Sequence, residues 1–159
     1  MRILILFILV IFTGCGRHSE DTVVTQMRVR TMQTRTYVGQ EAKKVSKEVI
    51  AVLQDQGYMV KNISHELGVI TAELDTNIEK FSSKFWSYLF SGKNARWKKH
   101  SVVEITSNIT EEQGRTKVRI NLLVRVFDNL GRVVNIHQIL EEEAYTDFFN
   151  QVQKGLLNN

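Results

Sequence analysis

The chain is poor in the residues that stabilise small scaffolds: its 159 residues include no proline and a single cysteine. One cysteine forms neither an intramolecular disulfide nor a cysteine-rich zinc site, so disulfide scaffolds and zinc ribbons are excluded. A hydrophobic share of 43% excludes a mainly disordered chain, and a charged share of 24% excludes an integral membrane bundle. Length and composition therefore predict one ordinary domain.

Recognisable catalytic and metal-binding motifs are also absent from the sequence. The four histidines are scattered along the chain, and none stands at the i, i+4 spacing of a helical metal pair. They are His18, His65, His100 and His137. The sequence contains no Gly-x-Ser-x-Gly motif and no glycine-rich phosphate loop. We therefore predict a protein that is not an enzyme, with no metal, no cofactor and no nucleic-acid partner.

The N-terminal segment carries the most specific signal. Arg2 precedes an unbroken apolar run from Ile3 to Phe12, which is shorter than the roughly 20 residues that a membrane-spanning helix needs. Two small residues and then the single cysteine, Cys15, follow the run, and the composition turns polar at once. This arrangement resembles the lipobox of bacterial lipoproteins, although Phe12 stands where Leu, Val or Ile is usual. The alternatives are a plain signal peptide cut near Gly14 and a chance apolar segment.

The lipobox resemblance implies a location and a domain plan. We expect a signal peptide at residues 1–14, a lipidated tether at residues 15–22 and a single domain at residues 23–159. Acyl chains on Cys15 would anchor the protein in the bilayer, because each buried methylene contributes about 0.8 kcal/mol. Gly16 stands where an aspartate would hold an enterobacterial lipoprotein at the inner membrane. The resemblance therefore implies the periplasmic face of the outer membrane, with the inner membrane as the alternative.

Hydrophobic periodicity predicts the elements of the domain. Strands are expected at residues 23–37, 58–65, 69–75, 102–109, 117–127 and 133–140, and helices at residues 40–56 and 144–157. Short turns between neighbouring strands favour antiparallel pairing, and amphipathic helices need a sheet face to cover. The predicted fold is α+β: a single antiparallel sheet of about five to six strands with two or three helices packed on one face.

Several motifs resemble those of a family of small uncharacterised Gram-negative lipoproteins. The family pattern is Arg-x-x-x-Thr-Arg, Leu-Gln-Asp-x-Gly-aromatic, Leu-Gly-x-Ile-Thr-Ala and Tyr-x-x-Phe-Phe. The matching residues are Arg30, Thr34, Arg35, Leu53, Gln54, Asp55, Gly57, Tyr58, Leu67, Gly68, Ile70, Thr71, Ala72, Tyr145, Phe148 and Phe149. The order of a helix followed by a hairpin is also similar, in topology alone, to the helix-grip domains of lipoprotein C of the outer-membrane β-barrel assembly machine. The resemblance implies no reaction.

Physical reasoning gives these motifs a mainly structural meaning. Gly57 is expected to end the first helix in a left-handed conformation, and Gly68 to form the hairpin turn. Phe148 and Phe149 lie on the apolar side of the last helix and are expected to anchor it in the core.

Residues 77–100 combine an aromatic stripe with a basic tail. The stripe consists of Ile78, Phe81, Phe85, Trp86, Leu89 and Phe90, at helical spacing. It fits either a third core helix or an interfacial helix that contacts a membrane or a partner. The tail contains Lys93, Arg96, Trp97, Lys98 and Lys99. Its composition favours contact with anionic headgroups or lipid A phosphates, and the alternative is a solvated loop.

The strand at residues 117–127 supplies a second basic feature. Lys117, Arg119 and Arg125 alternate with apolar residues, so one face is expected to be core and the other wet and basic. Three functional hypotheses follow. The first is a non-catalytic structural or adaptor lipoprotein that binds an envelope protein by the exposed sheet face or the aromatic stripe. The second is a binder of an anionic envelope ligand through these three residues and the basic tail. The third is a hydrolase without a recognisable motif.

Overall fold

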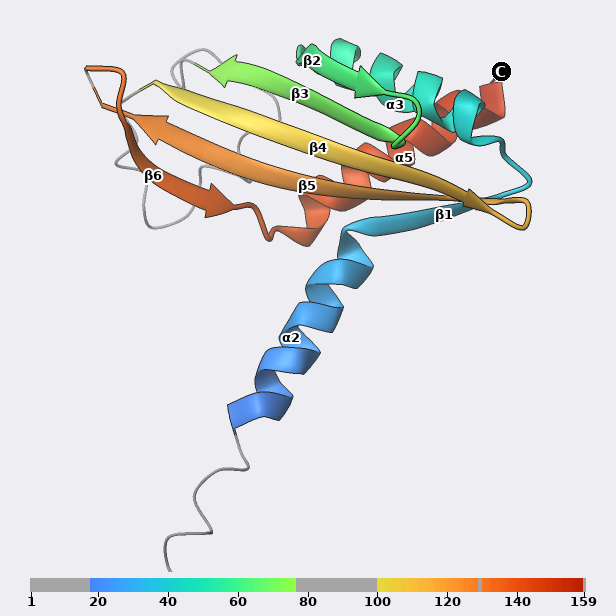
Figure 1. Ribbon diagram of the computed structural model, residues 1–159, viewed down its shortest axis with the longest axis horizontal. Helices are drawn as coiled ribbons and strands as arrows, with labels where there is room; N and C mark the ends of the chain where they lie inside the picture. Colours follow the sequence, from blue (N-terminus) through green and yellow to red (C-terminus); the bar gives the residue numbers. More distant parts are fainter. Residues whose placement is uncertain (1–17, 77–99, 129, 159) are drawn as a thin grey trace, which may run out of the picture. The chain divides into compact units, whose positions relative to one another are not determined.

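The computed structural model describes residues 18–76, 100–128 and 130–158 (Figure 1). The chain divides into two units, residues 1–31 and residues 32–159. The described part of the first unit belongs to α2 (His18–Met32), a helix of 15 residues. The second unit starts at Met32, so the expected start of the domain at residue 23 lies within α2.

The prediction of a strand at residues 23–37 is wrong for most of that range. Residues up to Met32 belong to α2, and only Thr34–Val38 form a strand, β1. The β-branched residues of this stretch suggested a strand, but propensity is a weak guide that context overrides. No glycine or proline interrupts α2, and Arg30 stands in its last turn, where positive charge suits the helix dipole. The helix also occupies part of the expected tether at residues 15–22.

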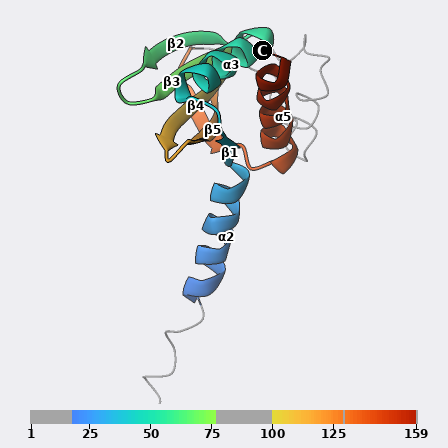
Figure 2. The same ribbon diagram turned by 90° about the vertical axis from the view of Figure 1, so that its right-hand side faces the viewer.

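The second unit is an antiparallel sheet with helices. Its other elements are α3 (Ala42–Asp55), β2 (Met59–Ser64), β3 (Val69–Thr76), β4 (Ser101–Glu112), β5 (Arg115–Phe127), β6 (Val133–Gln138) and α5 (Glu142–Asn158). Five of the six strands lie in the order β1-β5-β4-β3-β2, and the sixth, β6, also pairs with β5. Figure 2 shows α3 and α5 side by side on one face of this sheet. The predicted α+β architecture is confirmed.

The register of β5 explains how one strand holds three neighbours. Its first half pairs with β1, with Thr34 opposite Arg119. Its second half pairs with β6, with Leu123 opposite Gln138. Along its other side β5 pairs with β4 over nearly its whole length. Every second residue of β5, from Thr116 to Val126, is buried, because side chains of a strand alternate between the two faces of the sheet.

The first core helix, α3, is held at both ends by groups outside it. Its N-cap residue, Glu41, makes no side-chain hydrogen bond to the helix. Instead the Glu111 carboxylate of β4 accepts a hydrogen bond from the Ala42 amide at 2.7 Å. At the other end Gly57 has a φ of +85°, and the Tyr58 amide bonds to the Leu53 carbonyl. The predicted left-handed helix end at Gly57 is confirmed.

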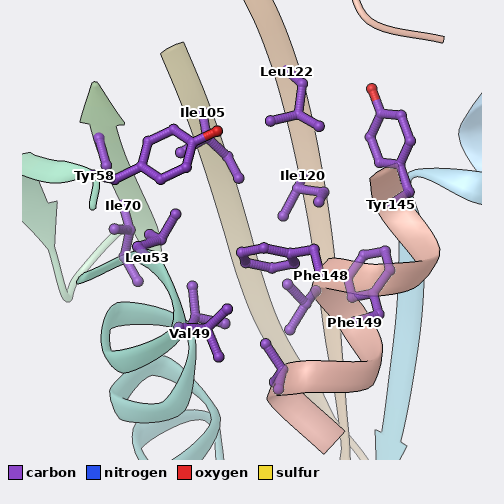
Figure 3. Close-up of a cluster of buried hydrophobic side chains, with 14 of the residues drawn as sticks. Val49, Leu53, Tyr58, Ile70, Ile105, Ile120, Leu122, Tyr145, Phe148 and Phe149 are labelled. Carbon is purple, nitrogen blue, oxygen red and sulfur yellow. The ribbon is translucent and has the colours of Figure 1, made fainter. Parts of the chain in front are cut away.

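The core lies between the sheet and the two helices (Figure 3). Phe148 and Phe149 of α5 are both buried, and their ring centroids lie 5.8 Å apart in an edge-to-face arrangement. The Arg35 guanidinium lies 5.5 Å from the centroid of the Phe149 ring. The predicted role of both phenylalanines as core anchors of the last helix is confirmed.

Two buried tyrosines in this core should respond oppositely to the loss of their hydroxyls. The Tyr145 hydroxyl donates to the Ile139 carbonyl at 2.6 Å. The Tyr58 hydroxyl is buried and has no hydrogen-bond partner in the part of the chain that the structure describes. We expect Tyr145→Phe to lower the free energy of unfolding by about 1 kcal/mol, and Tyr58→Phe to leave it unchanged or raise it, because an unsatisfied buried hydroxyl is costly. Urea unfolding followed by circular dichroism measures both, and equal losses would contradict the hydrogen-bond assignment.

Candidate functional site

Most of the predicted contact residues lie outside the described residues. These are the lipidation candidate Cys15, the aromatic stripe from Ile78 to Phe90, and the tail residues Lys93, Arg96, Trp97, Lys98 and Lys99. The structure places the other three, Lys117, Arg119 and Arg125, on β5. Their side chains lie on the outer face of the sheet, opposite the face that α3 and α5 cover, because the intervening residues are buried.

Arg125 is surrounded by acidic groups. Its guanidinium lies 2.6 Å from the Glu73 carboxylate of β3 and 2.9 Å from the Glu104 carboxylate of β4. The Lys61 ammonium lies 3.6 Å from Glu73 on the far side. The outer face is therefore balanced in charge around Arg125, and the expectation of a wet and basic face is wrong there. Strand order brings the two glutamates beside Arg125, and the spacing within a single strand does not show that order.

Lys117 and Arg119 lie at the other end of β5, beside β1. Arg119 Nε donates to Thr34 Oγ1 at 3.4 Å. Arg119 and Arg125 are separated by about 20 Å along the strand, since each residue of an antiparallel strand advances about 3.4 Å. The structure thus does not bring the three predicted residues together, and only Lys117 and Arg119 form a neighbouring basic pair.

An exposed apolar surface surrounds β6, which we call the β6 surface. Its side chains are between 47% and 76% exposed. They belong to Leu130, Val133, Val134, Ile136 and Leu140. β6 pairs with β5 along one side, and no described strand pairs with its other side. An edge strand with exposed apolar side chains is a ready template for another chain.

The sequence held a partial signal for the β6 surface. Val133 and Val134 are adjacent in the strand, and adjacent side chains of a strand point to opposite faces. Hence at most one of the two could lie on the core face, and the other had to face outward. Ile136 is exposed as well because it pairs with Arg125, whose side chain lies on the outer face of the sheet, and the sequence pattern does not show this pairing.

A groove runs between α3, the β2–β3 hairpin and the end of β4, and we call it the α3 groove. Its volume is about 820 Å³. Apolar atoms form most of its lining surface, and the apolar lining residues are Ala42, Ile50, Ile63, Leu67, Ile70 and Ile109. The polar lining residues are Lys43, Ser46, Lys47, Ser64, His65, Glu66, Thr110 and Glu111. Such a volume lies within the range of about 300–1,000 Å³ typical of ligand sites.

Local sequence explains both walls of the α3 groove. On the helix side, Ala42, Ser46 and Ile50 are spaced four residues apart and therefore lie along one face of α3. On the hairpin side, Gly68 has a φ of +64°, and its carbonyl accepts the Ile109 amide at 2.8 Å. The predicted hairpin role of Gly68 is confirmed, and its contact with Ile109 joins the hairpin to β4 beneath the groove.

Across the described ranges, no group of three or more His, Cys, Asp or Glu residues could hold a metal ion. His100 pairs with Asp75, with its Nδ1 3.2 Å from the carboxylate. No helix among the described residues is long and apolar enough to cross a membrane. In the α3 groove the Ser46 hydroxyl donates to the Ala42 carbonyl and the Ser64 hydroxyl accepts the Leu67 amide, so among the described residues neither serine is hydrogen-bonded to His65.

Comparisons with known proteins give a distant likeness among solved structures. No family model matches the chain, and no curated protein is similar to it in sequence. Among solved structures, the chain is similar to a DUF4468 family protein from Bacteroides ovatus ATCC 8483, with a TM-score of 0.39 and 10% sequence identity. The alignment covers 77% of this chain and 83% of that one.

Proposed function

We propose that this chain is a lipid-anchored, non-catalytic module of the bacterial cell envelope that binds another protein through the β6 surface. The observation that carries the proposal is the exposure of five apolar side chains within residues 130–140. Single exposed apolar residues are ordinary on protein surfaces. A contiguous group of them on one strand and its flanks marks an interaction site.

The unpaired side of β6 favours one mode of binding. Backbone amides and carbonyls along that side have no strand partner in the described part of the chain. A partner segment in extended conformation would satisfy them by adding a strand to the sheet, and the exposed side chains of Val134 and Ile136 would provide apolar contacts to it. Backbone pairing supplies affinity in this mode, and the flanking side chains supply specificity.

The anchor half of the proposal comes from the sequence. The apolar run that ends at Cys15 resembles a lipobox, and acylation of this cysteine would hold the module at a membrane. The outer membrane, with the module facing the periplasm, is the location that Gly16 favours. The partner is then another envelope protein with an unpaired strand or extended segment.

Site-specific photo-cross-linking in intact cells tests the protein-binding half. A photoreactive amino acid at Val134 or Ile136 of the full chain should give the same adduct of higher mass, because both side chains belong to the β6 surface. The same probe at Thr36, which is exposed on β1, should not give it. Ile136→Asp should reduce the yield from the probe at Val134 at least about fivefold, since a charge opposes burial.

Two results would overturn this proposal. One is the absence of any adduct from both β6 positions. The other is an adduct of equal mass and yield from Thr36, which would mean contact without specificity for β6. The free energy of unfolding of Ile136→Asp should stay within about 0.5 kcal/mol of wild type, because the side chain is 57% exposed. That control separates a lost contact from a lost fold.

A further inference from the structure

The α3 groove has an apolar floor and a basic rim on one wall. Ile70 and Ile109 at its base are buried, and Ile50 of α3 and Ile63 of the hairpin flank them. Lys43 and Lys47 lie one helical turn apart on α3 and are both exposed. Among the described residues neither lysine has an ion-pair partner, whereas the neighbouring Lys44 donates to the Leu156 carbonyl. Two exposed lysines without an ion-pair partner among the described residues thus stand beside the apolar floor of the groove.

The two acidic residues of the groove make other contacts or lie on the other wall, and neither forms an ion pair with Lys43 or Lys47 among the described residues. Glu111 accepts the Ala42 amide at 2.7 Å, so its carboxylate already serves as the cap of α3. Glu66 is exposed near the tip of the hairpin, on the opposite wall. His65 is adjacent to it, and the hydroxyls of Ser46 and Ser64 complete the polar lining. The positive charges of the groove are Lys43 and Lys47 of α3, so an anionic group would pair with them on that wall.

The geometry points to a binding site for a single-chain amphipathic anion in the α3 groove. The acyl chain would lie over Ile70 and Ile109, between Ile50 and Ile63, because these side chains offer continuous apolar contact. The anionic head would lie at the α3 rim, within reach of Lys43 and Lys47. A long-chain carboxylate and the phosphate of a single-chain lipid share this chemistry. The site is separate from the β6 surface and does not depend on the proposed protein partner.

Photo-labelling of the full chain in nanodiscs tests the site. The probe is a long-chain fatty acid with a diazirine near the end of its acyl chain, and adducts are mapped by peptide mass spectrometry. We expect adducts on peptides that contain Ile50, Ile63 or Leu67. An excess of unlabelled long-chain carboxylate, or of a lysophosphatidate, should suppress them. The neutral monoacylglycerol of equal chain length should compete at least about tenfold less well, because it lacks the charge that the lysines recognise.

Charge-neutral variants give the matched comparison. The double variant Lys43→Gln, Lys47→Gln should weaken labelling by more than about tenfold at equal probe concentration. Lys154→Gln removes the same charge from α5, outside the groove, and should leave labelling unchanged. Competition by the carboxylate alone, or by the phosphate lipid alone, would identify the head group. Adducts outside the groove, or equal competition by the neutral lipid, would overturn the proposal.

Discussion

Phe149→Ala is expected to lower the free energy of unfolding by about 3–5 kcal/mol, as truncation of a well-buried phenylalanine typically does. The Phe149 side chain is 1% exposed and contacts Phe148 edge-to-face at 5.8 Å. The variant also loses the ring beneath the Arg35 guanidinium. Since a domain of this size is stable by about 5–15 kcal/mol, the loss should shift the urea midpoint strongly, as measured by circular dichroism.

The control for this prediction lies on the same helix. Leu157 belongs to α5 and is 75% exposed, so Leu157→Ala should change the free energy of unfolding by less than about 0.5 kcal/mol. If Phe149→Ala and Leu157→Ala unfolded at the same urea concentration, the packing of α5 on the sheet would be wrong.

Gly68→Ala is expected to destabilise the domain through a direct clash in the β2–β3 turn. A Cβ at this position would lie 2.1 Å from the Ile109 carbonyl oxygen, where the contacting atom is backbone and cannot swing away. The φ of +64° adds the strain of a left-handed conformation, about 1–2 kcal/mol for a residue with a Cβ. The clash and the strain both arise at Gly68, which lines the α3 groove. The variant should therefore also disturb any ligand held in the groove.

Alanine substitutions at two other glycines measure the cost of the left-handed strain without the steric clash. Gly39 and Gly114 have φ values of +70° and +71°, and an added Cβ would meet nothing within 4 Å at either. Alanine there should cost only the left-handed strain, about 1–2 kcal/mol. Gly68→Ala should exceed that loss by roughly 1–3 kcal/mol, the usual cost of overpacking. Equal losses at all three positions would mean that the hairpin does not pack against Ile109 as described.

The sequence predicted those elements whose periodicity agrees with their burial. In β5 alternate residues are buried as the pattern required, and in α5 the expected apolar side, with Tyr145, Phe148 and Phe149, is buried in full. The pattern failed at α2, where Val and Thr suggested a strand but the backbone is helical up to Met32. Strand propensity mostly reflects packing against neighbours in a sheet.

Features that join distant parts of the chain could not be predicted. Glu73, Glu104 and Arg125 come from three different strands, so their ion pairs appear only once the strand order is known. The α3 groove likewise combines one face of α3 with a hairpin and with the end of β4. Spacing within one element shows which side chains share a face, and it does not show which elements meet.

The central claim is that a lipid on Cys15 holds this chain at a membrane, and metabolic labelling measures this directly. Cells that express the full chain are grown with an alkyne-bearing fatty acid, and the chain is isolated and coupled to a fluorophore. The wild-type chain should carry the label and sediment with the membranes. Cys15→Ala should carry none, because the single cysteine of the chain is the site that the lipobox resemblance implies. Unchanged labelling and sedimentation of Cys15→Ala would contradict the claim.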